Sequence, residues 1–152
     1  MIMSAPDDDI HPQAAIAPGY LVNHAAKVFN RSVDAKLRPH GLSLALLGPL
    51  LLLSWKGSMR QRDLVRLSAV RQPAMVALLD KLESLGLIER TRSIDDRRAA
   101  TVRLTESGQA AALLGGNTLI EVNRIGVAGF SIDEATAVVG LLQSLIRNLE
   151  AD

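Results

Sequence analysis

The chain has 152 residues, a formal net charge of +1 and 48% hydrophobic residues, which suits one domain with a buried core or one subunit of an oligomer. It has no cysteine, which excludes a disulfide framework, a zinc site built from cysteine thiolates and a thiol-based redox switch. The three histidines, His11, His24 and His40, lack the spacing of a zinc motif. No Ser/His/Asp order or carboxylate pair stands in a recognisable setting. We therefore expect no enzyme activity, no metal and no cofactor.

Charge is distributed unevenly along the chain. Residues 56–103 hold eleven Lys and Arg against six Asp and Glu, a net charge of +5, whereas the rest holds six against ten, a net charge of −4. A basic middle between acidic ends is typical of a protein that binds nucleic acid, because phosphate contacts need positive charge. A solvated charged face would give the same count, so charge alone leaves both interpretations open.

The N-terminal segment, residues 1–17, contains two prolines and the acidic run Asp7-Asp8-Asp9. Its lack of periodicity predicts a disordered arm, and the acidic run stands where a secretory signal would carry positive charge. The apolar stretch 42–55 is too short to span a bilayer and contains Pro49. We therefore expect a cytoplasmic protein without a membrane partner.

Two helices are predicted after this arm. Apolar residues at helical spacing indicate a first helix over residues 19–37, which Pro39-His40-Gly41 ends. Ser43 is placed to cap a second, strongly apolar helix that runs to about Trp55. Pro49 inside that helix removes one backbone hydrogen bond and should bend it. Ser58-Met59 is the candidate for a short strand.

The centre of the chain predicts a helix-turn-helix. Its first helix, residues 61–68, should turn Leu64 and Leu67 inward, and the short link Ala69-Val70 leads to a second helix that ends before Gly86. Apolar residues at helical spacing predict the buried stripe of the second helix: Met75, Leu78, Leu79, Leu82 and Leu85. The opposite face carries Pro73, Ala77, Asp80 and Ser84.

A β-hairpin should follow the second helix. Residues 87–92 and 99–104 flank a polar turn at 93–98, and residues 101–104 alternate polar and apolar with the period of a strand. Two helices and a hairpin in this order predict a mainly α fold with a small β-hairpin wing (α+β), which is a winged helix-turn-helix.

Two further helices should complete the chain. Thr105 is a plausible N-cap for a long helix to about residue 127, in which Gly115-Gly116 indicates either close packing or a bend. Ser131 and Glu134 have the spacing of a capping box. The last helix has a wide apolar face, formed by Ile132, Ala135, Val138, Val139, Leu142, Leu145, Ile146 and Leu149. Such a face needs a partner, which could be its own subunit or a second one.

The central segment contains a spaced set of residues: Leu64, the run Leu79-Asp80-Lys81-Leu82-Glu83, Gly86-Leu87-Ile88 with Arg90, Asp96-Arg97-Arg98, and Leu104-Thr105 with Gly108. In these residues the segment resembles the MarR family of bacterial transcription regulators. This pattern is long and gapped, and with the flanking helices the resemblance covers roughly residues 18–150.

The resemblance implies a domain organisation and a function. Residues 43–104 would form the DNA-binding lobe, and residues 18–42 and 105–152 would form dimerisation helices that interleave with those of a second copy. The implied protein is a homodimeric, sequence-specific regulator of transcription, most often a repressor, on a pseudo-palindromic operator. A small aromatic or lipophilic effector in a cleft beside the first, second and fifth helices would release it from DNA, and no motif identifies the residues of that cleft.

The resemblance also implies roles for single residues. Asp96 would orient Arg98 at the tip of the wing for entry into the minor groove, and Asp80 and Arg90 would form a structural ion pair. The expected DNA-binding set is Arg71, Gln72, Pro73, Ala74, Val76, Ala77, Lys81, Asp96, Arg97 and Arg98.

The recognition helix departs from the family pattern. Family members often have Ser or Thr and a basic residue where this chain has Ala74, Val76 and Ala77. Only Arg71 and Gln72 near the start of the helix can form hydrogen bonds with base edges, while the small apolar side chains can touch thymine methyl groups. An alternative interpretation therefore stays open, in which the winged helix binds another protein and never contacts DNA.

Overall fold

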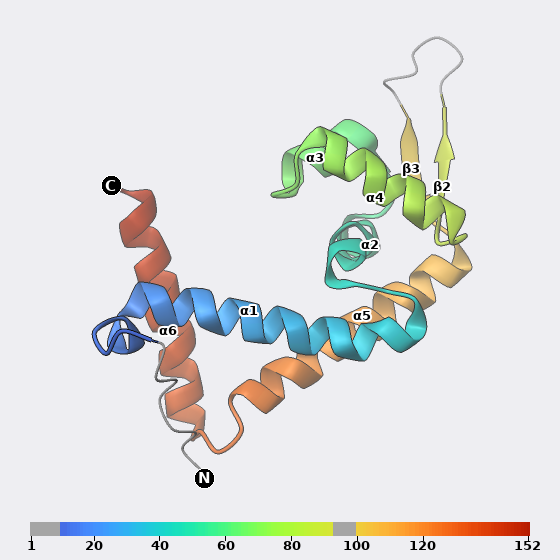
Figure 1. Cartoon of the computed structure of the whole chain (residues 1–152). Helices are drawn as coiled ribbons and strands as arrows, with labels where there is room; N and C mark the ends of the chain where they lie inside the picture. Colours follow the sequence, from blue (N-terminus) through green and yellow to red (C-terminus); the bar gives the residue numbers. More distant parts are fainter. Residues whose placement is uncertain (1–9, 93–99) are drawn as a thin grey trace.

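The computed structural model describes residues 10–92 and 100–152. Figure 1 shows a lobe built from α2, α3, α4 and a small sheet, standing above one end of the neighbouring helices α1 and α5, with α6 at the other end. The elements in chain order are η1 (Ala14–Ile16), α1 (Pro18–Leu37), η2 (Arg38–His40), α2 (Leu44–Lys56), β1 (Met59–Arg60), α3 (Gln61–Leu67), α4 (Gln72–Ser84), β2 (Ile88–Thr91), β3 (Thr101–Leu104), α5 (Glu106–Gly126) and α6 (Ile132–Glu150). The predicted mainly α fold with a small sheet is confirmed.

The helix ends follow local chemistry. The Ser43 hydroxyl accepts a hydrogen bond from the Leu46 N–H, and the Thr105 hydroxyl accepts one from the Gly108 N–H. Ser131 and Glu134 form the predicted capping box at the start of α6. Gly86 has a φ of 73°, which glycine adopts without strain and which ends α4 two residues after Ser84.

The sheet has the order β1-β3-β2, and both pairs are antiparallel. Ile88 lies opposite Leu104 and Thr91 opposite Thr101, which is the predicted hairpin. The short strand expected at Ser58-Met59 begins one residue later, and Met59 pairs with Val102. The Gln61 N–H donates a hydrogen bond to the Ala100 carbonyl, so the start of α3 is joined to the hairpin.

The helix α2 lies at the centre of the core. It packs against α1, α4, α5 and β3, and Leu47 and Leu50 on it are fully buried. A Cβ added to Gly115 of α5 would lie 1.9 Å from Leu47 Cδ1. Of the two explanations for the glycine pair, close packing of α5 against α2 therefore holds at Gly115.

Two leucines predicted to be buried are exposed. Leu67 is 45% exposed and Leu85 is 41% exposed. Each lies at the end of its helix: Leu67 is the last residue of α3, and Leu85 follows the last residue of α4. A helical repeat predicts burial only where the helix still runs along the core. Of the predicted disordered arm, residues 1–9 lie outside the described residues, and Ala14–Ile16 form η1, a short 3-10 helix.

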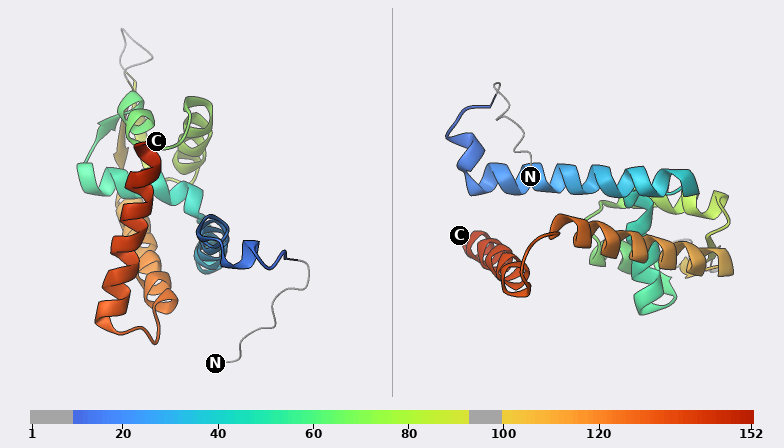
Figure 2. Two further views of the ribbon diagram at one scale, coloured as in Figure 1. Left: turned by 90° about the vertical axis from the view of Figure 1, so that its left-hand side faces the viewer. Right: turned by 90° about the horizontal axis from the view of Figure 1, so that it is seen from below.

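The helix α6 makes few contacts with the rest of its own chain. None of its residues is buried, and the right-hand view of Figure 2 shows it apart from α1. Its large exposed apolar side chains are Ile132, Val138, Val139, Leu141, Leu142, Ile146 and Leu149.

Within the described residues, 10–92 and 100–152, no single helix is both long and apolar enough to cross a membrane. The α1–η2 and α2 segments reach that length and hydropathy only as a pair, bent by 81° at the break between them.

Candidate nucleic-acid interface

The recognition helix of the helix-turn-helix is α4. It begins after Arg71, which has extended backbone, and carries Pro73 in its first turn, where a missing N–H costs little. Three fully buried side chains hold it on the core: Met75, Leu79 and Leu82. This packing fixes which face of α4 points outward.

The structure places most of the predicted contact residues of α4 on that outward surface. Six of them are exposed: Arg71, Gln72, Pro73, Ala74, Ala77 and Lys81. Val76 is half-buried and therefore offers less surface to a partner. Among the exposed residues from Arg71 to Ala77, only Arg71 and Gln72 have side chains that can form hydrogen bonds. Hydrogen bonds to base edges could therefore form only at the N-terminal end of α4.

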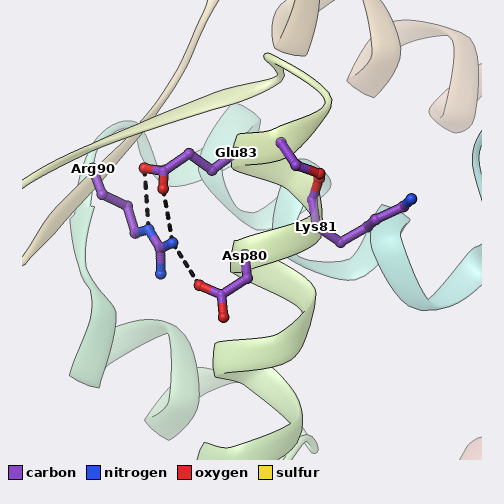
Figure 3. A network of polar contacts seen from close by, with 5 residues as sticks. Asp80, Lys81, Glu83 and Arg90 are labelled. Atoms are coloured by element: carbon purple, nitrogen blue, oxygen red, sulfur yellow. Dashed lines mark hydrogen bonds and ion pairs between the residues drawn. The ribbon is translucent and has the colours of Figure 1, made fainter.

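A cluster of charges links α4 to the strand β2. Arg90 on β2 contacts Asp80, the partner implied by the resemblance, with Nη2 2.6 Å from Oδ1. It also contacts Glu83 twice, through Nε at 3.2 Å and Nη2 at 2.9 Å (Figure 3). The Arg90 side chain is 7% exposed, whereas those of Asp80 and Glu83 are 60% and 42% exposed. The cation is thus enclosed by two carboxylates that water still reaches.

The charges in this cluster stabilise one another. Hydrogen bonding from Arg90 lowers the pKa of Glu83 below its ordinary value, against the opposing effect of burial. Hydrogen bonding to Glu83, and then to Asp80, raises the pKa of Arg90. Although Asp80 makes the shortest single contact, Glu83 makes two, so we regard Glu83 as the principal partner of Arg90.

The sequence did not single out Glu83 for this cluster. The available signal was its spacing: Asp80 and Glu83 are three residues apart on a helix and therefore lie on neighbouring positions of one surface. Lys81 lies between them in sequence, yet its side chain points away from Arg90 (Figure 3). It remains free to reach a phosphate.

Other ion pairs support the surroundings of α4. Arg103 and Glu89 lie directly opposite each other on β3 and β2 and form an ion pair across the sheet. Arg66 and Asp63 of α3 are 3.6 Å apart. Both pairs are largely exposed, so each contributes little to stability.

The predicted tip of the wing, Asp96, Arg97 and Arg98, lies outside the described residues. Its entry into the minor groove stays a prediction.

Comparison with known proteins identifies the domain that this geometry forms. Residues 42–100 match the model of the MarR family. This segment of the chain is thus similar to the domain that defines the MarR family. This match begins at the loop before α2 and runs past β2, so it contains the whole helix-turn-helix with α4 and stops just before β3.

Solved structures of similar proteins extend the likeness to the flanking helices. A probable transcriptional regulator from Pseudomonas aeruginosa is 27% identical, with a TM-score of 0.74 over 86% of this chain and 98% of that one. A MarR-family protein of Mycobacterium tuberculosis in complex with salicylic acid is 27% identical, with a TM-score of 0.66 over 85% and 96%. A mutant of MarR from E. coli in complex with operator DNA is 22% identical, with a TM-score of 0.75 over 90% and 99%.

The chain therefore shares the winged-helix fold of these proteins, including the probable transcriptional regulator from Pseudomonas aeruginosa and the MarR-family protein of Mycobacterium tuberculosis.

Proposed function

We propose that the protein is a sequence-specific regulator of transcription that binds double-stranded DNA as a homodimer. The observation that carries the proposal is the position of α4, whose inner stripe is locked into the core while Arg71, Gln72 and Lys81 are exposed on its outer side. A helix held in this way can enter a major groove as a rigid body. The related E. coli protein in complex with operator DNA supports the same use.

The exposed surface of α4 assigns different roles to its residues. Arg71 and Gln72 would form hydrogen bonds with base edges, and Pro73, Ala74, Val76 and Ala77 would touch thymine methyl groups. Lys81 would reach a phosphate, which positions the protein without reading sequence. At the wing, Arg98, oriented by Asp96 and flanked by Arg97, would favour a narrow A·T-rich minor groove.

The homodimer is supported by α6. Its apolar side chains are exposed although the helix has a complete N-terminal cap, so the helix is well specified but lacks a surface to pack on. A second copy would supply that surface through its own α1, α5 and α6. A dimer with a two-fold axis would present two α4 helices to half-sites about one turn of DNA apart.

We also propose how the DNA binding is regulated, by analogy with the structurally similar MarR-family proteins. The homodimer would act in the cytoplasm as a repressor that a small effector releases from its operator. A relative in complex with salicylic acid supports the presence of a ligand site in this fold.

The decisive experiment is selection of bound fragments from random DNA, followed by a salt titration on the selected duplex. We expect enrichment of a pseudo-palindrome and an affinity that falls steeply with salt, because phosphate contacts release counterions. Arg71→Ala should weaken binding to the selected site more than to generic duplex, whereas Lys81→Ala should weaken both alike.

A second candidate, a protein-binding winged helix, is favoured by the apolar surface of Pro73, Ala74 and Ala77, all of which are exposed. The same titration separates the two. A full-length chain that binds no duplex even at low salt would support the protein-binding module and contradict DNA recognition.

A further inference from the structure

The C-terminal end of α4 meets the N-terminal end of α5 at the base of the hairpin (Figure 1). We call this meeting point the α4–α5 junction. It consists of Gly86 and Leu87, which follow α4, and of Thr105 and Gly108 at the start of α5. The ends of the recognition helix and of the long helix α5 are thus in direct contact, although the chain from β2 to β3 separates them in sequence.

The turn Gly86-Leu87 uses its backbone polar groups in two directions. The Gly86 N–H donates to the Glu83 carbonyl at 3.0 Å. The Leu87 N–H donates to the Leu82 carbonyl, also at 3.0 Å, and together these bonds form the Schellman pattern that ends a helix. The two carbonyl groups accept hydrogen bonds from α5 instead. Thr105 Oγ1 donates to the Gly86 oxygen at 2.6 Å, and the Thr105 N–H donates to the Leu87 oxygen at 3.1 Å. The turn is therefore bonded to α4 through its N–H groups and to Thr105 through its carbonyl groups.

The Thr105 hydroxyl has two separate tasks. While it donates to the Gly86 carbonyl, it also accepts a hydrogen bond from the Gly108 N–H at 3.0 Å. A hydroxyl can do both at once, because it has one donor hydrogen and two acceptor lone pairs. The second bond caps α5, whereas the first reaches across to the end of α4. The two tasks can be separated chemically, since a carboxylate can accept a hydrogen bond but cannot donate one.

Gly108 allows the close approach of α5 to the turn. A Cβ added to Gly108 would lie 1.9 Å from the Leu87 carbonyl oxygen and 3.1 Å from Leu104 Cδ2. The first of these contacts is with backbone, which cannot rotate away as a flexible side chain can. Any larger residue at position 108 must therefore push α5 and the turn apart.

The end of α4 that would read DNA lies far from the junction. The helix has 13 residues, so its first residue lies roughly 18 Å from its last. A tilt of about 10° at the junction would move that first turn by about 3 Å, which is close to the rise of one base pair. Apolar packing has no preferred direction, whereas a hydrogen bond weakens steeply when it bends. The junction is therefore the part of the lobe that is suited to hold this angle.

We propose that Thr105 and Gly108 are positioning residues that set the angle between α4 and α5, and thereby the spacing of half-sites that the dimer accepts. The proposal rests on the proposed function, in which α4 reads each half-site and α5 leads into the dimerisation helix α6. Because a two-fold axis repeats the same angle in both subunits, a change of the angle moves both α4 helices along the DNA.

The first test uses the full chain and three substitutions of one residue. Thr105→Ser keeps both the donor and the acceptor. Thr105→Asp keeps the acceptor that caps α5 but cannot donate to the Gly86 carbonyl. Thr105→Val keeps the shape of the side chain and has neither group. Affinity is measured for duplexes with half-sites at the selected spacing, or one base pair closer or farther. Each added base pair shifts a half-site by about 3.4 Å and turns it by about 35°.

The spacing preference is the expected readout. Wild type and Thr105→Ser should lose at least about tenfold in affinity when the spacing changes by one base pair, whereas Thr105→Asp and Thr105→Val should lose less than about threefold. Agreement between Asp and Val assigns the effect to the lost donor, because Asp still caps α5. Affinity for a single half-site should be equal in all four chains. Ser43→Ala, which removes the cap of α2 but leaves the junction intact, should keep the wild-type preference. An undiminished spacing preference in both Asp and Val overturns the proposal.

A second pair of variants tests the close approach. Gly108→Ala should change which spacing is bound best, because α5 must move away from the Leu87 carbonyl. Gly116→Ala lies on the same helix, where an added Cβ meets only Leu51 Cδ2 at 3.8 Å, and should leave the preferred spacing unchanged. A folded Gly108→Ala chain with the wild-type preference contradicts the role of Gly108. If this variant does not fold, the Thr105 series decides.

The angle itself can be measured without DNA. The chain has no cysteine, so spin labels can be attached through Ala77→Cys on α4 and Arg124→Cys on α5, both at exposed positions. The labelled chain is mixed with an excess of unlabelled chain, so that the measured distance lies within one chain. We expect one narrow distance in wild type and Thr105→Ser, and a broader distribution in Thr105→Asp and Thr105→Val. Equal widths in all four would show that the junction does not fix the angle.

The two readouts distinguish failure of this inference from failure of the proposed function. If wild type binds duplex but the Asp and Val variants keep its spacing preference, the inference fails and the proposed function stands. If wild type binds no duplex at any salt concentration, the proposed function fails together with the spacing role, and the label distances still decide whether Thr105 holds α4 against α5.

Discussion

The Arg90 side chain connects the strand β2 to the recognition helix α4 through its ion pairs. It is nearly enclosed, and its charge is met by Asp80 and Glu83 on the recognition helix. A buried cation that loses a partner becomes costly, because desolvation is then uncompensated. Because the two carboxylates remain accessible to water, the cost of removing either one is moderated by solvent.

The first prediction concerns the unequal weight of these two carboxylates. Glu83→Gln should lower the free energy of unfolding by roughly 1 kcal/mol, and Asp80→Asn should lower it by less, because Glu83 makes two of the three contacts. Urea denaturation measures both. Glu89→Gln is the control, since its pair with Arg103 is more than half exposed on both sides and should contribute at most about 0.5 kcal/mol. A larger loss for Asp80→Asn than for Glu83→Gln would contradict this ranking.

A second prediction at the same scale concerns pH. The pKa of Glu83 is lower in the folded protein than its ordinary value of 4.5. Its contribution is therefore fully present above about pH 5 and is lost as pH falls through the folded pKa, because the protonated carboxyl no longer attracts Arg90. The difference in unfolding free energy between wild type and Glu83→Gln should shrink steadily below the ordinary pKa. A difference that stays constant down to about pH 3 would show that charge is not its source.

At the scale of elements, α2 and α5 pack closely because α5 has a glycine, without a side chain, at the point of contact. Gly115 allows α5 to approach Leu47 closely, while Gly116 next to it has only Leu51 Cδ2 near, at 3.8 Å from an added Cβ. Two adjacent glycines of one helix thus differ in what surrounds them.

The third prediction follows from this difference. Gly115→Ala should destabilise the fold by about 1–3 kcal/mol, because Leu47 is fully buried and must shift in a packed core. Gly116→Ala should be neutral or should stabilise the fold by up to about 1 kcal/mol, because alanine favours the helix and meets only ordinary contact distance. Thermal unfolding of the two variants side by side provides the measurement. The same sign for both changes would refute the role assigned to Gly115.

The elements themselves could largely be predicted from sequence, for local reasons. Ser43, Thr105 and Ser131 cap helices through hydrogen bonds a few residues away, which a sequence pattern contains. Leu67 and Leu85 were mispredicted because burial at a helix end depends on where the next segment goes.

In the candidate site too, features set by local sequence could be predicted, whereas features set by distant segments could not. The exposed side of α4 could be predicted from helical periodicity, because its opposite side had to be apolar. The contribution of Glu83 could not, since it depends on how closely β2 approaches α4.

At the scale of the whole molecule, α6 is the helix whose apolar side chains are left most exposed to solvent. It has a full cap and an apolar face that its own chain leaves exposed. The isolated chain therefore contains a surface whose burial requires another molecule.

The fourth prediction tests the proposed second copy with two neighbouring residues. Leu142→Glu on the apolar face of α6 should convert the dimer to a folded monomer, because a carboxylate would be buried in the interface without a partner. Gln143→Glu adds the same charge next to it, off that face, and should leave the dimer intact. Sedimentation velocity gives the mass of each, and circular dichroism verifies that α6 remains folded. A dimer that persists in Leu142→Glu would show that α6 is not its interface.

The hairpin and the helix-turn-helix share one backbone ladder, through Met59 paired with Val102 and the Gln61 N–H bonded to the Ala100 carbonyl. Met59 and Val102 are distant in sequence, so breaking this junction alone would recover little of the chain entropy that its closure costs. In amide hydrogen exchange, the Gln61 N–H should then be as slow as amides of the central core, and it should open in the same cooperative unit as β3. A short surface strand would thus report on the global unfolding of the lobe.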